Sequence, residues 1–396
     1  MLNRVFMAWA GIGLSAALLS ACGGGTPASA ASVPADALLS AQAALGQKIF
    51  ADISLSASGR QACTSCHSPD AGHAPSNGLA VQLGGALLNL AGARAAPGIK
   101  YGSTNTDFHF AADGTPTGGL FWDGRVASLQ AQAREPFLNP MEMANASPAD
   151  LVDKLSRAAY ADEFKRVFGA DILTRPDDAL ARVALALQAY QLEDTDFRPF
   201  SSKYDEFLRG RAALSAQETR GLALFNNPSK GNCTGCHPSG KAADGGFPLF
   251  TDFTYDNLGV PRNMAIAKNA DPAYFDLGLC ARADLAARSD LCGAFKVPSL
   301  RNVALRKTYF HNGRFTTLKD AVTFYVQRDT HPEKWYPLNP DGTVNKFDDL
   351  PPQHHSNVNT TEVPYNRRRV DAPALSDAEV DDVVTFLKTL SDGYKP

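Results

Sequence analysis

Two copies of one short motif constrain this chain more than any other feature. Residues 63–67 read CTSCH and residues 233–237 read CTGCH, so both have the pattern Cys-x-x-Cys-His. This spacing suits a c-type haem, because two thiols add to the vinyl groups of one porphyrin while the adjacent imidazole reaches the iron. One copy alone could be a redox dithiol, but two copies in a chain with an export signal predict two covalently bound haem c groups. The predicted haem-binding residues are Cys63, Cys66, His67, Cys233, Cys236 and His237.

The N-terminus carries the export signal. Residues 1–21 contain one arginine and then an apolar run that ends in small residues, which is typical of a signal peptide. The run ends in LSAC at residues 19–22, which resembles the bacterial lipobox, whose cysteine is acylated; an ordinary cleaved signal is the alternative. Residues 22–37, rich in Gly, Ala, Ser and Pro, suit a flexible tether. We therefore expect a periplasmic protein that contacts the membrane, the outer membrane being favoured, only through a lipid on Cys22.

Length and charge limit the remaining classes. A chain of 396 residues is too long for one compact core, and domains of roughly 100–200 residues predict two of them. The formal net charge of −3 gives no argument for a nucleic-acid partner. After the signal, no segment reaches the roughly 18 consecutive apolar residues of a membrane-spanning helix.

An internal repeat supports two haem domains. Residues 39–50 and 214–225, which precede the two haem motifs, share the letters LSAQ, a glycine seven positions on and a final phenylalanine. Each segment reads as a helix capped by serine, with apolar residues at helical spacing. Residues 176–191 and 375–390 read as a closing helix for each domain.

These patterns predict the fold class. Strand-like alternation is scarce, and loops rich in Gly, Pro and Asn are many. We predict a mainly α protein with two cytochrome c-like domains, a peroxidatic haem domain at residues 38–200 and a second haem domain at residues 201–396. The predicted joint lies near residues 201–213.

Two cysteines remain after the haem and lipid assignments. Cys280 and Cys292 lie twelve residues apart in a chain bound for an oxidising compartment. A disulfide that closes a surface loop is the favoured state there, with metal ligation or free thiols as alternatives.

Two long segments carry a family resemblance. FWDGRVASLQAQAREPFLNPMEM (121–143) and KVPSLRNVALRKTYFHNG (296–313) resemble the bacterial di-haem peroxidase family, which includes the maturase MauG. The resemblance implies that the first haem meets hydrogen peroxide and that Gln132 and Glu142 form the peroxide pocket, with Glu142 moving a proton between the two peroxide oxygens. It implies that Trp122 lies between the haems and carries a hole. The alternatives are a solvated Gln and Glu at a helix start and a core Trp.

The sixth ligand of each haem iron distinguishes the ordinary peroxidases of this family from its MauG-like members. Ordinary members cap the first haem with a histidine about sixteen residues after the motif, where this chain has Leu83, so we expect an open first iron. They cap the second haem with a methionine fourteen residues after the histidine that corresponds to His311, and that count arrives at Tyr325. Leu318, Ala321 and Val322 share a predicted helical face with Tyr325. The predicted axial ligands of the haem irons are thus His67, His237 and Tyr325.

A phenolate ligand changes the expected role of the second haem. An anionic oxygen donor stabilises high oxidation states, whereas a neutral thioether favours the reduced one. The resemblance therefore implies that peroxide forms a high-valent di-haem state that stores oxidising equivalents. A non-catalytic di-haem electron carrier and a peroxidase that takes electrons from a small cytochrome or cupredoxin are the alternatives.

A narrower resemblance concerns the partner. Four segments, residues 278–302, 324–337, 346–368 and 389–394, are similar to the MbnH subfamily of MauG-like enzymes. That similarity implies an exported copper-binding protein as partner and oxidation of a partner tryptophan to kynurenine.

Calcium is the one implied cofactor that the sequence disfavours. The family's inter-haem calcium site uses an Asn where this chain has Ala95. A bound ion would have to rest on backbone carbonyls near Arg306 and Thr308 and on water.

Overall fold

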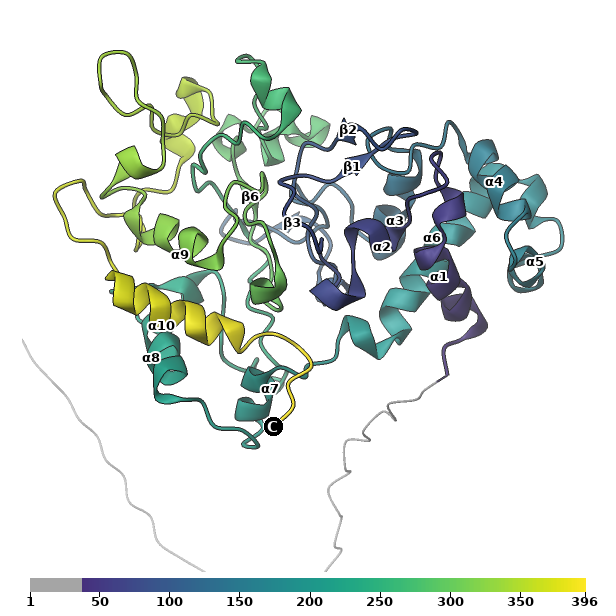
Figure 1. The fold of residues 1–396 in the computed structure, drawn as a ribbon, viewed down its shortest axis with the longest axis horizontal. Helices are drawn as coiled ribbons and strands as arrows, with labels where there is room; N and C mark the ends of the chain where they lie inside the picture. The colour runs from purple at the N-terminus through teal and green to yellow at the C-terminus, as the bar shows by residue number, and fades with distance from the viewer. Residues whose placement is uncertain (1–37) are drawn as a thin grey trace, which may run out of the picture. The chain divides into compact units, whose positions relative to one another are not determined.

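The computed structural model describes residues 38–396 (Figure 1). Two pairs of crossed helices form the main packing contacts in this part of the chain. The helices are α1 (Ala41–Ala51), α2 (Cys63–Cys66), α3 (Leu129–Leu138), α4 (Pro148–Ser156), α5 (Ala161–Phe168), α6 (Pro176–Glu193), α7 (Lys203–Leu208), α8 (Ala216–Asn226), α9 (Leu318–Gln327) and α10 (Asp377–Lys388). The strands are β1 (Leu83–Gly84), β2 (Leu90–Ala91), β3 (His109–Phe110), β4 (Pro116–Thr117), β5 (Tyr255–Asp256) and β6 (Phe295–Lys296). The predicted signal peptide, Cys22 and the tether lie outside the described residues.

Helices α1 and α6 form the first crossed pair, on the right of Figure 1. Ser40 caps α1, because its hydroxyl accepts the amide N–H of Ala43 at 3.2 Å. Gly46 lies at the crossing, where a Cβ atom would come within 2.0 Å of the carbonyl oxygen of Ala186. Only glycine allows the two backbones to approach this closely.

Helices α8 and α10 repeat this arrangement in the second half of the chain. Ser215 and Glu218 form a capping box at the start of α8, as Ser376 and Glu379 do at the start of α10. A Cβ at Gly221 would lie 2.1 Å from the carbonyl oxygen of Asp382. The glycines shared by the two sequence repeats therefore have the same role in each helix pair, and the four helices predicted from the sequence are confirmed.

Two separate hydrophobic cores accompany the helix pairs. One is built from residues between Leu45 and Phe197 and the other from residues between Tyr204 and Leu390. Residues 39–396 nevertheless form one compact unit, and the division at residue 200 stays a prediction. The expected joint differs from a simple linker, because it contains α7, whose Asp205 is fully buried against Arg301.

Strands are short, as expected from a mainly α chain. The six strands pair as three antiparallel two-stranded sheets, β1–β2, β3–β4 and β5–β6. Beside β5 and β6 lies a small third cluster that contains the predicted Cys280–Cys292 disulfide, with an S–S distance of 2.03 Å. The mainly α class is confirmed.

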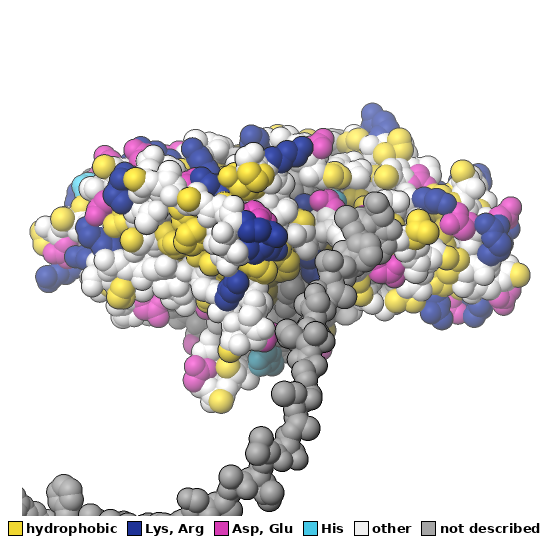
Figure 2. Space-filling view, turned by 90° about the horizontal axis from the view of Figure 1, so that it is seen from below, with side chains coloured by type: hydrophobic (Ala, Val, Ile, Leu, Met, Phe, Trp, Pro, Cys, Tyr) yellow, Lys and Arg dark blue, Asp and Glu magenta, His cyan; other side chains and the backbone are white. Residues whose placement is uncertain are grey.

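The surface agrees with the nearly neutral composition. Lys and Arg side chains are interspersed with Asp and Glu over the face seen in Figure 2. Among residues 38–396, no helix is long and apolar enough to cross a membrane.

Candidate functional site

One cavity of about 1480 Å³ brings both haem motifs together. Its walls come from segments that are far apart in the chain and include every residue for which the sequence predicts a haem or peroxide role. These are Cys63, Cys66, His67, Trp122, Gln132, Glu142, Cys233, Cys236, His237 and Tyr325. The four motif cysteines are free thiols, so they are available to bond to two porphyrins.

The two motif histidines are oriented in the same way. The Nδ1 atom of His67 donates to the carbonyl oxygen of His73 at 3.2 Å, and Nδ1 of His237 donates to that of Phe250 at 2.7 Å. A carbonyl oxygen only accepts, so each Nδ1 carries the hydrogen and each Nε2 keeps a free lone pair. Burial lowers the pKa of His67 to about 4 and also lowers that of His237, which keeps both rings neutral. Both residues therefore fit as haem ligands of the kind whose second nitrogen is held by a backbone carbonyl.

Gln132 and Glu142 both line the cavity, and Glu142 is close to the first motif, where its charge adds to burial in raising the pKa of the Cys66 thiol. Gln132 belongs to α3, which Ser128 caps, and Glu142 follows in the turn after this helix. Asn139 donates from Nδ2 to the Oε1 atom of Glu142 at 2.7 Å. Burial raises the pKa of Glu142, and this hydrogen bond only partly offsets the effect. A carboxyl group with a raised pKa is suited to proton transfer at the cavity wall.

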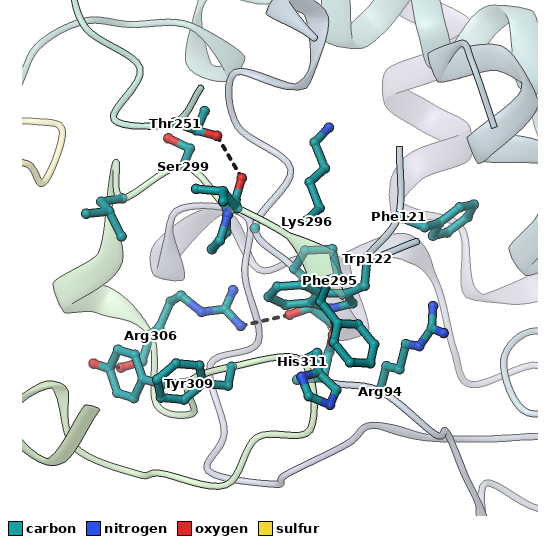
Figure 3. Close-up of a pocket in the computed structure, with 18 of the residues that line it drawn as sticks. Arg94, Phe121, Trp122, Thr251, Phe295, Lys296, Ser299, Arg306, Tyr309 and His311 are labelled. Atoms are coloured by element: carbon teal, nitrogen blue, oxygen red, sulfur yellow. Dashed lines mark hydrogen bonds between the residues drawn. The ribbon is translucent and has the colours of Figure 1, made fainter. Parts of the chain in front are cut away.

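Trp122 lies in an aromatic group at the centre of the cavity wall. Its indole Nε1 donates to the carbonyl oxygen of Ala95 at 2.8 Å. The rings of Phe295 and His311 stack at 3.5 Å with an interplanar angle of 8°, and Figure 3 shows them close to Trp122. Burial lowers the pKa of His311 to about 3, so this ring is also neutral.

Phe295 and His311 are cavity residues for which the sequence predicts no individual role. His311 is only the starting point of the count to Tyr325, and Phe295 lies in the loop at residues 278–302 that carries part of the narrower resemblance. Their contact joins segments sixteen residues apart, so local periodicity could not have predicted it. The backbone N–H of Lys296, which donates to the carbonyl oxygen of Trp122 at 2.9 Å, holds this strand beside the tryptophan.

Tyr325 projects from α9 into the cavity near the second motif. The predicted face is present, because Leu318, Ala321, Val322 and Tyr325 all line the cavity. The opposite side of α9 places Phe324 in the second core. Burial, and then the charges of Cys236 and other nearby acids, raise the pKa of the Tyr325 hydroxyl above its ordinary value. The hydroxyl forms no hydrogen bond with the described residues and is therefore free to bind a group in the cavity.

The expected distal position of the first haem has no histidine. Leu83 lines the cavity there. His73 instead bonds through Nε2 to Asp196 Oδ2 at 2.7 Å, and His109 lies on β3; neither lines the cavity.

The implied calcium ion does not fit this site. The carbonyl oxygen of Thr308 accepts from Arg306 Nε at 3.3 Å, and that of Arg306 accepts from the Tyr309 hydroxyl at 3.0 Å. The guanidinium of Arg306 adds a positive charge at the same place; burial lowers its pKa only to about 10, so it remains protonated at neutral pH. Within residues 38–396, no group of three or more His, Cys, Asp or Glu side chains could hold a metal ion.

Trp335 and Tyr336 are buried in the second core. Trp335 packs edge-on against Phe315 and Phe324, and the Tyr336 hydroxyl donates to the carbonyl oxygen of Gly259 at 2.6 Å. Their environment is that of packing residues.

Comparison with solved structures agrees with this arrangement. The diheme peroxidase BthA from Burkholderia thailandensis matches with a TM-score of 0.82 and 41% identity over 89% of this chain and 86% of that chain. A MauG-like protein associated with microbial copper homeostasis matches with a TM-score of 0.61 and 25% identity over 91% of this chain and 92% of that chain. The chain is thus less similar to the copper-homeostasis protein than to BthA.

Sequence comparison gives the family. A family profile described as di-haem cytochrome c peroxidase matches residues 40–213. The methylamine utilization protein MauG of Paracoccus denitrificans is 36% identical over 92% of this chain and 91% of its own length. The cytochrome c551 peroxidase of Nitrosomonas europaea is 32% identical over 71% of each chain. With two haem motifs facing one cavity, the chain belongs to the di-haem cytochrome c peroxidase/MauG family of peroxide-dependent oxidoreductases.

Proposed function

We propose that this enzyme uses hydrogen peroxide to oxidise a protein partner at a distance, instead of drawing electrons from a small donor protein. The observation that carries the proposal is the Tyr325 hydroxyl, which faces the cavity beside the second motif and has no hydrogen-bond partner among the described residues. A tyrosinate ligand favours the storage of oxidising equivalents over the receipt of single electrons.

The residues near the first motif react with peroxide, and Trp122 connects them to the second motif. Haem c, held at each motif by its two cysteines and its histidine, would supply an oxidisable iron there, and peroxide would meet the one at the first motif. Glu142 takes a proton from one peroxide oxygen and returns it to the other, so that water leaves, and Gln132 orients the peroxide beside it. Trp122, with an easily oxidised ring held by Ala95, carries the hole between the two ends of the cavity.

The partner in this proposal is an exported copper-binding protein, and the oxidised residue is a tryptophan. Two peroxide molecules balance the conversion of tryptophan to N-formylkynurenine with release of two waters, and hydrolysis to formate then leaves kynurenine. The resemblance of residues 278–302, 324–337, 346–368 and 389–394 to the MbnH subfamily supports this choice. So does the similarity to the MauG-like protein associated with microbial copper homeostasis.

Peroxide scavenging with a small electron donor is the second candidate. It is supported by the relatives named cytochrome c551 peroxidase and diheme peroxidase. The two candidates differ in where the electrons come from, so they are separable by experiment.

The test mixes the purified di-haem protein with peroxide and a copper-binding protein encoded beside its gene. Mass spectrometry of that protein should show a modified tryptophan, and reduced cytochrome c in a parallel reaction should be oxidised slowly. Omission of peroxide is the control. An unmodified partner together with rapid cytochrome c oxidation would favour the scavenging peroxidase.

We also propose that Cys22 anchors the enzyme to a periplasmic membrane surface. The lipobox-like letters at residues 19–22 support this. Replacement of Cys22 by serine should move the protein from the membrane fraction to the soluble periplasmic fraction, and an unchanged distribution would argue against the lipid.

A further inference from the structure

Arg306 is a half-buried cation without a carboxylate partner. Its guanidinium lines the cavity and donates from Nη2 to the carbonyl oxygen of Ala96 at 3.1 Å and from Nε to that of Thr308 at 3.3 Å. Figure 3 shows the side chain extended towards Trp122 and Phe295. In the described part of the chain, Arg306 forms no ion pair.

The other arginines that line the cavity are paired. Each has a carboxylate within ion-pair distance: Arg94 with Asp276, Arg125 with Glu135, and Arg301 with Asp205. A buried charge is costly unless it is paired and hydrogen-bonded. Two neutral carbonyls satisfy some N–H groups of Arg306 but do not neutralise its charge. A group that fills the cavity would bury this guanidinium, so an acidic group on it would supply the counter-charge.

We propose that the Arg306 guanidinium is a fixed cation of the haem cavity, that it stands where the family resemblance places calcium, and that haem propionate carboxylates are its counter-charge. A planar guanidinium is well suited to carboxylates, because it presents several N–H donors in a rigid fork. The inference rests on the two haem c groups of the family and is independent of which partner the enzyme oxidises.

The position of Arg306 links this cation to the predicted hole carrier. Ala96 accepts the hydrogen bond from Arg306, and the preceding residue, Ala95, accepts the one from the Trp122 indole. One short backbone segment thus joins the cation and the tryptophan. A protein-borne cation cannot be lost to a chelator, so the electrostatics of the cavity should not depend on calcium supply.

A fixed positive charge near an iron favours its reduced form, which carries one positive charge fewer. Replacement of Arg306 by glutamine removes the charge and keeps a hydrogen-bond donor. We expect R306Q to lower the reduction equilibrium constant of at least one haem tenfold or more, which is about 59 mV for one electron. R306K, which keeps the charge, should stay within threefold of the wild type.

The experiment measures both haem potentials by spectroelectrochemistry on holoproteins with confirmed haem content. Lys307→Gln is the matched control. It also removes one positive charge, but from the exposed side chain of the next residue, so it should change neither potential. Unchanged potentials in R306Q, or a lysine variant that behaves like the glutamine variant, would overturn the inference.

Metal analysis provides a test that needs no variant. The wild-type holoprotein, purified with calcium present, should contain far less than one calcium ion per two haems. Its ferric spectrum and potentials should not change on treatment with a calcium chelator. Stoichiometric calcium, or a spectrum that the chelator alters, would overturn the assignment even if R306Q failed to fold.

Discussion

The rings of Tyr325 and Tyr365 lie 6.0 Å apart, centroid to centroid, at an interplanar angle of 34°, and both residues line the haem cavity. Burial raises the pKa of both hydroxyls. Only Tyr325 stands on the face of α9 that the spacing from His311 predicts. Tyr325 is therefore the candidate iron ligand, and Tyr365 is a neighbouring tyrosine in the same environment that can serve as its control.

Replacement of Tyr325 by methionine should leave both haems attached, because the motif cysteines and histidines are unchanged. It should remove the phenolate signature of the second haem and shorten the lifetime of the oxidised state, since a thioether favours the reduced iron. Electron paramagnetic resonance and stopped-flow absorption after peroxide addition measure both effects. Tyr365→Phe is the control and should retain the wild-type signature; a Tyr325 variant with an unchanged spectrum would show that Tyr325 is not a ligand.

Glu142→Gln should slow the reaction with peroxide roughly 100-fold or more, the lower end of the range for general acid–base catalysis. The amide keeps the size of the side chain but cannot accept the proton. Stopped-flow mixing with peroxide gives the rate. Glu163→Gln, a change of the same kind in the Lys48 ion pair away from the cavity, should leave the rate unchanged. If E142Q reacts as fast as the wild type, Glu142 has only a structural role.

Trp122→Phe should impair oxidation of the partner more than consumption of peroxide. Phenylalanine fills most of the space but has no easily oxidised indole and loses the hydrogen bond to Ala95. Partner modification by mass spectrometry and peroxide loss should be followed in the same reaction. Trp335→Phe, which changes a buried packing tryptophan, should affect neither rate. An equal loss of both activities in W122F would contradict a role in hole transfer.

Removal of the Cys280–Cys292 disulfide should lower the free energy of unfolding by about 3 kcal/mol, the size expected for a loop of this length. Within the loop that the bridge closes, only Ala281 lines the haem cavity, so haem content and peroxide rate should stay the same. Denaturant unfolding of the double serine variant against the wild type measures the change. Equal stability of the two proteins would show that the loop is held by its packing alone.

Asp205→Asn should cost about 3–5 kcal/mol, because it leaves the buried Arg301 charge without its partner. Burial alone would raise the pKa of Asp205, but hydrogen bonds from Arg301 and Ser202 outweigh it, and the pKa is lowered. The stabilisation is therefore present above the ordinary aspartate pKa and is lost as the pH falls through the lowered value. The acid limb of a stability–pH profile measures this, and D205N should lack that contribution.

The exposed Asp381, which pairs with Lys319, provides the control for the buried pair. Asp381→Asn should cost no more than about 1 kcal/mol, since surface ion pairs are screened by water. A similar loss in both variants would contradict the buried-pair argument.

The local features of this protein could be predicted from the sequence because their physics is local. The haem motifs are covalent patterns of five residues. The caps at Ser40, Ser215 and Ser376 satisfy N–H groups within one helical turn, so helices α1, α8 and α10 followed from short spacings. The cavity face of α9 followed from helical periodicity in the same way.

The tertiary structure decided everything that depends on contacts between distant segments. It brought Phe295 and His311 together beside Trp122, buried Trp335 in a core, and placed the Asp205–Arg301 pair in a segment expected to be a joint. It also set the Arg306 guanidinium against Ala96, 210 residues earlier in the chain. No periodicity encodes such contacts, because they are chosen by the packing of whole helices and loops, and they determine which charges and aromatic rings face the haem cavity.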